Sequence, residues 1–197
     1  NYPKLYKYFY GKYPNNWLIG EIKNIRTGFS SSPQIRQNSA SGGIITETLI
    51  YLLEEKIVDA VIIAKQGIPS PEKARAYIAT KKEEVLECSG SIYIPVSMLD
   101  ILKELDTTKK YAITCLPEQS SALRAMQEKK YKPALQIKFI LGPYTGTALY
   151  PKAIRTYLRS KRIKNNDKVK SLKWRAGSWP GYLEIKTKRQ TWRHTTW

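Results

Sequence analysis

Apolar positions recur along this chain with two different periods. Stretches in which they return every three or four residues predict helices over 43–55, 81–87, 96–105, 117–129 and 148–162. Between these helices lie short apolar runs rich in valine and isoleucine over 58–64, 111–116 and 135–141, with a further strand candidate over 74–80. Runs that are apolar throughout are typical of strands buried on both faces. The pattern predicts an α/β fold with a layered, mostly parallel central sheet flanked by helices.

The two ends of the chain follow a different pattern. From residue 169 onward, segments of period two flank the turn over Gly177–Gly181 and predict a C-terminal antiparallel extension. At the other end, tyrosines alternate with polar residues over 1–16, which favours an arm that packs its rings on a neighbour. A short strand over 17–25 and a polar loop over 27–38 follow. We therefore predict a single domain, 1–197, consisting of an arm (1–17), an α/β core (18–164), a polar linker (161–170) and an antiparallel β extension (168–197).

The strongly positive charge of the chain is compatible with several classes of partner. The formal net charge is +18, and the last 47 residues hold 14 of the 34 basic side chains with only two acidic ones. Such a block attracts nucleic acids, anionic membranes, acidic proteins or phosphate-rich cofactors, and charge alone does not choose between them. If the partner is a nucleic acid, its bases would stack on Trp174, Trp179, Trp192 and Trp197. The simple alternative is a solvated basic face.

Composition also bears on the compartment. No run approaches the roughly 18 apolar residues that span a bilayer, and no secretory signal opens the sequence, so we expect no transmembrane segment and a cytoplasmic location. Cys88 and Cys115 fit two buried thiols in a reducing compartment. The sequence begins at Asn1 rather than at a methionine, as expected of a processed product or of part of a longer protein.

Small-residue loops mark a candidate site. Ser41, Gly42 and Gly43 precede a predicted helix, where uncovered N–H groups and the helix dipole favour an anion such as a phosphate. Pro117 and the turn from Gly142 to Gly146 follow buried strands directly, and a further small turn runs from Gly90 through Ser91 to Tyr93. Because ligands of parallel α/β sheets bind beyond the carboxyl ends of the strands, we expect these loops to form a pocket for a large, flat, phosphate-bearing ligand.

The sequence offers little catalytic machinery of its own. It contains no dinucleotide, Walker, zinc-protease or nucleophile-elbow motif. The single histidine, His194, lies near the C-terminus and is best interpreted as an exposed strand residue. Nothing pairs Glu47, Asp59 or Glu118 for acid–base work. Cys115 is either a reactive thiol near a helix start or, the favoured interpretation, a buried structural thiol.

Six elements occur in an order and spacing that resemble a known family. They are Ser39 to Thr46 (Ser-x-Ser-Gly-Gly-Ile-Ile-Thr), Tyr51 to Ala60, Gly90 to Tyr93, Leu116 to Gln119 with Ala122 to Arg124, Leu141 and Gly142 with Gly146, and Arg175 with Trp179 to Gly181. Together they resemble the coenzyme F-420 (F420) hydrogenase/dehydrogenase beta-subunit family. The resemblance implies an FAD-dependent oxidoreductase and electron-transfer subunit. Its members bind iron–sulfur clusters, work with redox partner subunits or a ferredoxin-like protein, and use coenzyme F-420 or another small acceptor.

The resemblance also assigns roles to residues. Ser41, Gly42 and Gly43 would lie against the flavin or its phosphates, and Gly90, Ser91 and Tyr93 would line the same pocket. Arg175 would meet a phosphate or an acidic group. With Pro117, Gly142 and Gly146 from the loops above, and Trp179, Pro180 and Gly181 as a pocket wall, these residues complete the candidate FAD site.

The chain departs from the family where clusters are held. Glu118 and Thr145 stand at positions where the family carries cysteines, and carboxylates and hydroxyls are poor substitutes for thiolates. We therefore predict no metal site and no iron–sulfur cluster within this chain. Two alternatives stay open. One is a cofactor-less interaction protein of the same fold, as in relatives linked to polysaccharide synthesis, with bulky side chains filling the pocket. The other is a polyanion binder that uses the basic C-terminal third.

Overall fold

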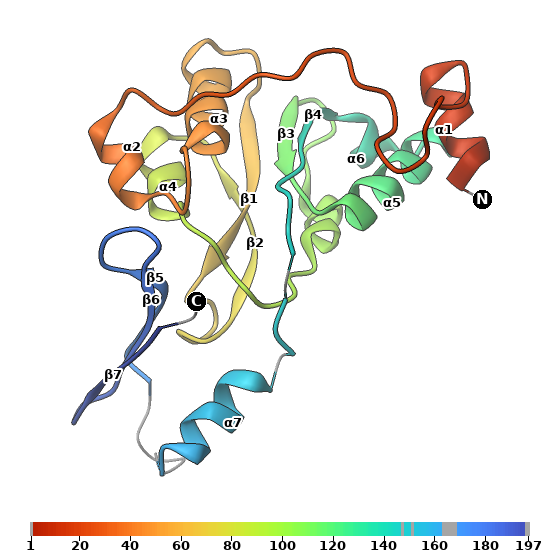
Figure 1. The fold of residues 1–197 in the computed structure, drawn as a ribbon. Coiled ribbons are helices and arrows are strands. Elements are labelled where there is room, and N and C mark those ends of the chain that lie inside the picture. Colours follow the sequence, from red (N-terminus) through yellow and green to blue (C-terminus); the bar gives the residue numbers. More distant parts are fainter. Residues whose placement is uncertain (1, 147, 151, 163–168, 196–197) are drawn as a thin grey trace.

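A four-stranded sheet forms the centre of the computed structural model, which describes residues 2–146, 148–150, 152–162 and 169–195 (Figure 1). The strands are β1 (Ala60–Gln66), β2 (Ala74–Ala79), β3 (Tyr111–Thr114) and β4 (Ile137–Leu141), in the order β2–β1–β3–β4. β1, β3 and β4 run parallel, whereas β2 pairs antiparallel with β1 at the edge. The mostly parallel sheet expected from the sequence is confirmed.

Helices cover both faces of this sheet. One face carries α2 (Pro33–Asn38), α3 (Ile44–Glu54) and α4 (Lys82–Glu87), and the other carries the 3₁₀ helix η1 (Met98–Glu104), α5 (Pro117–Glu128) and α6 (Lys132–Leu135). Val61 and Ala112 pack into the first layer, Ile62 and Ile113 into the second, and all four are fully buried. Because neither face meets water, the strands are apolar at successive positions.

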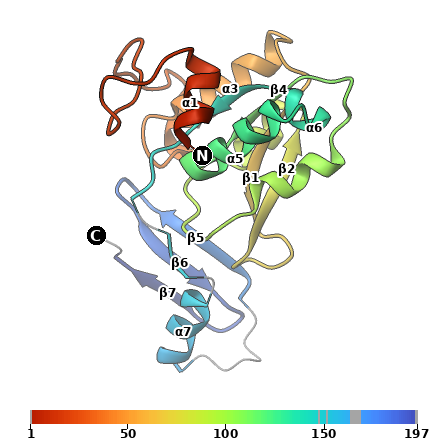
Figure 2. The same ribbon diagram turned by 90° about the vertical axis from the view of Figure 1, so that its right-hand side faces the viewer.

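The C-terminal part forms a separate antiparallel sheet, as the sequence predicts. It contains β5 (Ser171–Ala176), β6 (Tyr182–Lys186) and β7 (Thr191–His194), and α7 (Ala153–Ser160) packs beside it (Figure 2). Its small core contains Ile154, Trp174 and Ile185 and also takes in residues 92–94 from the segment before η1. The side-chain amide of Gln66, at the end of β1, donates to the carbonyl of Leu172 at 2.8 Å. The two sheets therefore share a packed boundary.

The N-terminal prediction is wrong in two respects. Residues Tyr2–Tyr10 form a helix, α1, rather than an irregular arm, because Tyr2, Tyr6 and Tyr10 recur every four residues and contact one another along one helix face. The strand expected over 17–25 is absent, since the Trp17 ring packs against Tyr2, Tyr6 and Tyr13 and no neighbouring strand is offered for pairing. The polar loop expected over 27–38 ends in α2, whose first turn is capped by the Ser32 hydroxyl.

Two further expectations concern the basic C-terminal third. Trp174 cannot serve as a stacking surface for a nucleic acid, because it is only 4% exposed in the core of the small sheet. The predicted linker 161–170 falls largely on residues 163–168, and these, like Trp197, lie outside the described residues.

A matched pair of substitutions measures how much the double-covered sheet contributes to stability. Ile113→Ala removes a fully buried side chain from β3 and leaves a cavity, so we expect the free energy of unfolding to fall by about 2–5 kcal/mol. Ile25→Ala makes the same chemical change at a solvent-exposed position and should cost less than about 0.5 kcal/mol. Urea titrations followed by circular dichroism measure both, and equal losses would contradict the packing described here.

Candidate functional site

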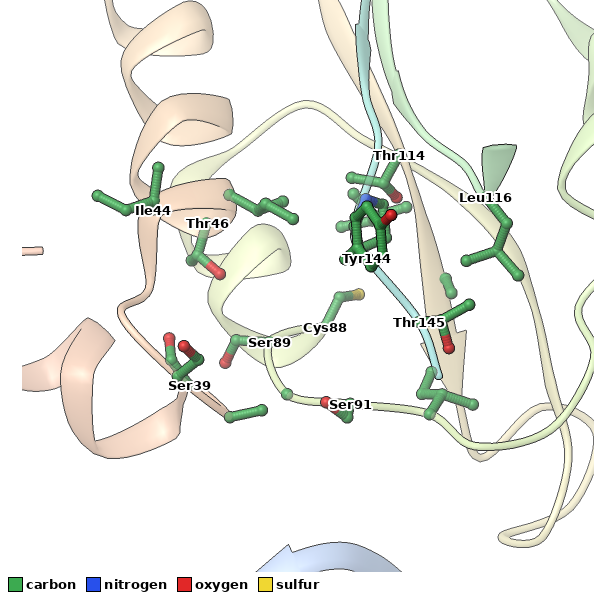
Figure 3. A pocket seen from close by; sticks show the side chains of 18 of the residues that line it. Ser39, Ile44, Thr46, Cys88, Ser89, Ser91, Thr114, Leu116, Tyr144 and Thr145 are labelled. Atoms are coloured by element: carbon green, nitrogen blue, oxygen red, sulfur yellow. The ribbon is translucent and has the colours of Figure 1, made fainter. Parts of the chain in front are cut away.

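A cavity of about 850 Å³ lies at the carboxyl ends of β1, β3 and β4 (Figure 3). Ile63 and Ala64 of β1, Thr114 at the end of β3, and the loop Pro143–Gly146 after β4 contribute to its wall. The start of α3 and the segment 88–94 lie opposite, as Figure 3 shows for Thr46, Cys88, Ser89 and Ser91. This is the edge of a parallel sheet at which ligands of α/β proteins bind.

The structure brings most of the predicted site residues together around this cavity. Its lining includes Ser41, Gly42, Gly43, Gly90, Ser91, Tyr93, Gly146 and Arg175. Pro117 and Gly142 do not line it, although their neighbours Leu116 and Pro143 do. Trp179, Pro180 and Gly181 lie in the turn between β5 and β6 and are not part of the lining. The turn itself requires glycine at position 181. Its φ of +85° is left-handed, and a Cβ there would lie 3.1 Å from the Cα of Arg175.

The sequence did not single out several other residues of the wall. Gln119 is the clearest case: its side chain accepts from the backbone N–H of Leu116 at 3.0 Å and donates to the carbonyl of Val96 at 2.7 Å. These two hydrogen bonds join the β3–α5 loop to the segment before η1. Only its place inside the Leu-Pro-Glu-Gln motif signalled this role. Thr46, the last residue of the motif that begins at Ser39, also lines the cavity, as does Cys88, for which the sequence gave no such signal.

The turn between α2 and α3 is held by its carbonyl groups. Ala40 accepts from the Arg175 guanidinium at 3.2 Å, Ser41 from the Arg36 guanidinium at 2.7 Å, and Gly42 from the backbone N–H of Ser30 at 2.7 Å. The Ser30 hydroxyl also donates to the carboxylate of Glu47. The N-cap residue of α3 is Gly43, which has no side chain, so the start of the helix has no side-chain cap. Residues 44–46, whose N–H groups have no partner within the helix, line the cavity. This is an anion-binding arrangement.

Gly43 is required by the fold rather than by a ligand. Its φ is +79°, and an added Cβ would lie 2.8 Å from Cγ2 of Ile35 and 3.1 Å from Oγ of Ser39. The space that Gly43 leaves open is therefore filled by α2 and its C-terminal turn. The backbone of Gly43 borders the cavity on the opposite side.

Arg175 joins three parts of the molecule at the cavity. It belongs to β5 of the small sheet, and its Nε donates to the Tyr93 hydroxyl at 2.8 Å while Nη1 donates to the carbonyl of Ala40. It is the one charged side chain in the lining formed by the described residues. A guanidinium placed beside the uncapped start of α3 reinforces the preference for an anion.

The two thiols form part of the apolar wall. Burial raises the pKa of both Cys88 and Cys115 to about 11, so both are protonated at neutral pH. The interpretation of Cys115 as a reactive thiolate is therefore wrong, and its role as a buried thiol is supported. In the described part of the chain, no three His, Cys, Asp or Glu side chains gather as metal ligands would.

Carboxylate and imidazole side chains are missing from the lining that the described residues form. Glu47 is engaged by Ser30, Asp59 accepts from the backbone N–H of Lys110 at 2.7 Å, and Glu118 is exposed on the first turn of α5. His194 lies beside Tyr157, with ring centroids 5.6 Å apart. The fold and the site thus define an α/β protein with a mostly apolar cavity at the carboxyl edge of its main sheet.

The family follows from two adjoining matches. Residues 25–103 match the N-terminal family model, and residues 108–196 the C-terminal one, of the coenzyme F420 hydrogenase/dehydrogenase beta subunit. The chain belongs to this family, as the motifs in its sequence indicated. Among the described residues, no helix is long and apolar enough to cross a membrane.

Individual relatives agree with this assignment. The chain is 30% identical over 112 residues to the coenzyme F420 hydrogenase subunit beta of Methanosarcina barkeri. The matched region covers 55% of this chain and 38% of that relative. It is 29% identical over 126 residues to the F420-dependent formate dehydrogenase 1 subunit beta of Methanococcus maripaludis, covering 62% and 32% respectively. A chain of the F420-reducing [NiFe] hydrogenase complex from Methanosarcina barkeri has the same fold, with a TM-score of 0.63 and 21% identity over 88% of this chain and 63% of that one. The chain spans only part of the length of these relatives.

A glycine pair tests whether the turn before α3 is as constrained as its contacts indicate. Gly43→Ala places a Cβ against Ile35 at a left-handed φ, so we expect it to lower the free energy of unfolding by about 2 kcal/mol or more. Gly146→Ala meets no atom within 4 Å and should leave stability unchanged or slightly higher. Denaturant titration of both variants decides, and a neutral Gly43→Ala would show that the turn is not packed as described.

The raised pKa values of the two thiols predict that their rate of alkylation depends steeply on pH. With a pKa of about 11 instead of the ordinary 9.0, the thiolate fraction at pH 8 is roughly 100-fold lower than in an unfolded chain. Iodoacetamide should therefore react slowly with the folded protein, and the rate should rise about tenfold per pH unit up to about pH 11. Cys88→Ser and Cys115→Ser assign the rates, with urea-unfolded protein as the control. A plateau near pH 9 would contradict the raised pKa values.

Proposed function

We propose that this chain is the FAD-binding part of an electron-transfer subunit, and that it exchanges electrons with coenzyme F420 or another small acceptor. The observation that carries the proposal is the cavity itself. A volume of about 850 Å³ suits a large organic cofactor, and its wall combines apolar and small side chains with one guanidinium. The family assignment supports a redox cofactor as the ligand, because the family is that of a hydrogenase/dehydrogenase subunit.

The residues present fit the two ends of such a dinucleotide. Ile63, Ala64 and Thr114, together with the protonated thiols, offer a mostly apolar surface to a flat ring system. The uncapped start of α3 and the Arg175 guanidinium offer N–H donors and positive charge to a diphosphate. Small residues at 40–43 and 89–91 leave room between these ends.

In this proposal the redox chemistry comes from the bound flavin, which can accept a hydride and release electrons singly. The chain's own residues bind, orient and exclude water. The hydrogen bonds of Arg175 to Tyr93 and Ala40 fix the distance between the small sheet and the α2–α3 turn, and so the width of the cavity at that point. A lining without carboxylate or imidazole in the described chain adds no competing proton transfer.

Electrons would have to leave through a partner. Glu118 is exposed on α5 and Thr145 borders the cavity, so both positions matched to family cysteines carry oxygen atoms near the sheet edge. Oxygen ligands hold iron–sulfur clusters poorly, and the absence of a cluster within this chain stays a prediction. Redox partner subunits, like those in the complexes to which the named relatives belong, would supply the onward path.

One observation favours this function over a cofactor-less interaction protein. That alternative predicts that bulky side chains fill the hollow behind Gly42 and Gly43. Ile35 does fill the space behind Gly43, but the cavity on the other side of the turn stays open. An open cavity of this size has no structural purpose in a protein that has lost its ligand.

Paired titrations with FAD and riboflavin test the proposal. We expect FAD to bind the purified chain with a shift of its absorbance spectrum. Arg175→Gln should weaken FAD about tenfold, because it removes a charged donor from the diphosphate, and should change riboflavin binding less than twofold. Lys173→Gln removes one charge from the exposed side of the same strand and should leave both affinities unchanged.

The outcomes distinguish a direct contact of Arg175 with FAD from a role of Arg175 in holding the cavity together. If FAD does not bind the wild-type chain, the proposed function is wrong. If Arg175→Gln weakens FAD and riboflavin equally, Arg175 acts by holding the cavity together through Tyr93 and Ala40, and its assignment to the diphosphate is wrong.

A further inference from the structure

An unusually apolar surface lies on the segment between α1 and α2, which borders the cavity only at its end, through Gly28. Residues 17–29 belong to no helix or strand, yet they carry a series of exposed apolar side chains: Trp17, Leu18, Ile19, Ile22, Ile25 and Phe29. Leu18 is 93% exposed and Ile25 81%. Single exposed apolar residues are common on protein surfaces, whereas several on one short segment indicate a contact surface. We name residues 17–29 the apolar loop.

Positive charge surrounds the apolar loop. The first 46 residues contain six basic side chains and a single acid, Glu21. Glu21 is paired with Lys12 at 3.1 Å, so it does not offset Lys23 and Arg26, which are exposed on the loop itself. Lys4 and Lys7 add exposed charge on α1. The surface therefore combines aliphatic residues with cations and lacks a free anion among its described residues.

The loop is also placed to reach a flat surface. Figure 2 shows the chain between α1 and α2 extending away from the layers of the main sheet. Its base is fixed by rings, since Trp17 packs against Tyr6 with centroids 5.5 Å apart and against Tyr13 at 6.1 Å. Residues 1–24 lie outside both family matches, so most of this feature is additional to the shared family core.

We propose that the apolar loop and α1 bind the surface of an anionic lipid bilayer, with the aliphatic side chains inserted among the acyl chains and the basic side chains at the headgroups. Tryptophan and tyrosine at the base of the loop are the residues that favour the membrane–water interface. Lys and Arg beside apolar side chains add electrostatic attraction to anionic headgroups.

The composition favours a bilayer over the two alternatives, a partner protein and a second copy of this chain. Lysine is depleted at the centres of protein–protein interfaces, whereas three of the four basic residues on α1 and the apolar loop are lysines. A second copy of this chain would bring two surfaces of like charge together, in a protein whose net charge is already +18. Binding is peripheral in this proposal, and it is independent of flavin in the cavity.

Vesicle flotation tests the proposal with the purified chain. We expect it to float with phosphatidylcholine vesicles that contain 30% phosphatidylserine and to remain unbound with phosphatidylcholine alone. The triple variant Leu18→Ser, Ile19→Ser, Ile25→Ser should lower the partition coefficient at least tenfold, because it removes the inserted apolar surface. Tyr150→Ser, at an exposed aromatic residue outside the loop, is the control and should bind like the wild type.

Charge reversal separates the loop from the basic C-terminal third. Lys23→Glu with Arg26→Glu should reduce binding at least tenfold, whereas Lys152→Glu with Arg155→Glu, which changes the net charge equally at α7, should reduce it less than threefold. Circular dichroism of each variant serves as the folding control. The proposal is overturned if the wild type binds no vesicle at low salt, which would favour a protein partner, or if the α7 pair weakens binding as much as the loop pair.

A fluorescent probe reports insertion directly. An environment-sensitive dye on Leu18→Cys should shift to shorter wavelength when anionic vesicles are added, and the same dye on Tyr150→Cys should not. Cys88 and Cys115 label slowly at neutral pH because their pKa values are raised to about 11. If the dye on Leu18→Cys shows no shift although the protein floats, adsorption is purely electrostatic and the insertion proposed here is wrong.

Discussion

The backbone turn between α2 and α3 is the constraint on which the site depends. Gly43 takes a left-handed conformation and packs against Ile35, and the carbonyls of three consecutive residues, 40–42, are each held by a donor from a different segment. These contacts set the direction of the chain as it enters α3. The N-cap residue of α3 is Gly43 itself, so the helix begins without a side-chain cap, and residues 44–46, whose N–H groups have no partner within the helix, line the cavity.

The cavity also depends on the boundary between the two sheets. Residues 92–94 pack into the core of the small sheet while lining the cavity, and Arg175 and Gln66 tie the two sheets together by hydrogen bonds. The two family matches meet between η1 and β3, so each contributes two strands to the main sheet and part of the cavity wall. The site therefore belongs to the whole packed unit, and neither half of the chain could form it alone.

The central part of the fold could be predicted because one physical signal dominated there. Burial on both faces forces continuous apolar strands, and Ala60–Gln66 and Tyr111–Thr114 form near the predicted positions. The N-terminus defeated the same method, since Tyr2, Tyr6 and Tyr10 satisfy both a period of two and a period of four, and only contact with Trp17 decides for the helix. In the site, chain order placed the glycine loops at one sheet edge. The hydrogen bonds of Gln119 and Arg175 join residues that are distant in sequence, which no local pattern encodes.

The cavity and the apolar loop require opposite properties of the same basic protein. At the cavity a single, partly buried guanidinium lies among mostly apolar walls, where a charge is screened less than on the surface. On the loop, the charges are exposed and screened by salt, so only several together with inserted apolar side chains give useful affinity. The net charge of +18 therefore has no single purpose. Its contribution depends on the local dielectric environment, which is why composition alone could not distinguish a phosphate-bearing cofactor from an anionic surface.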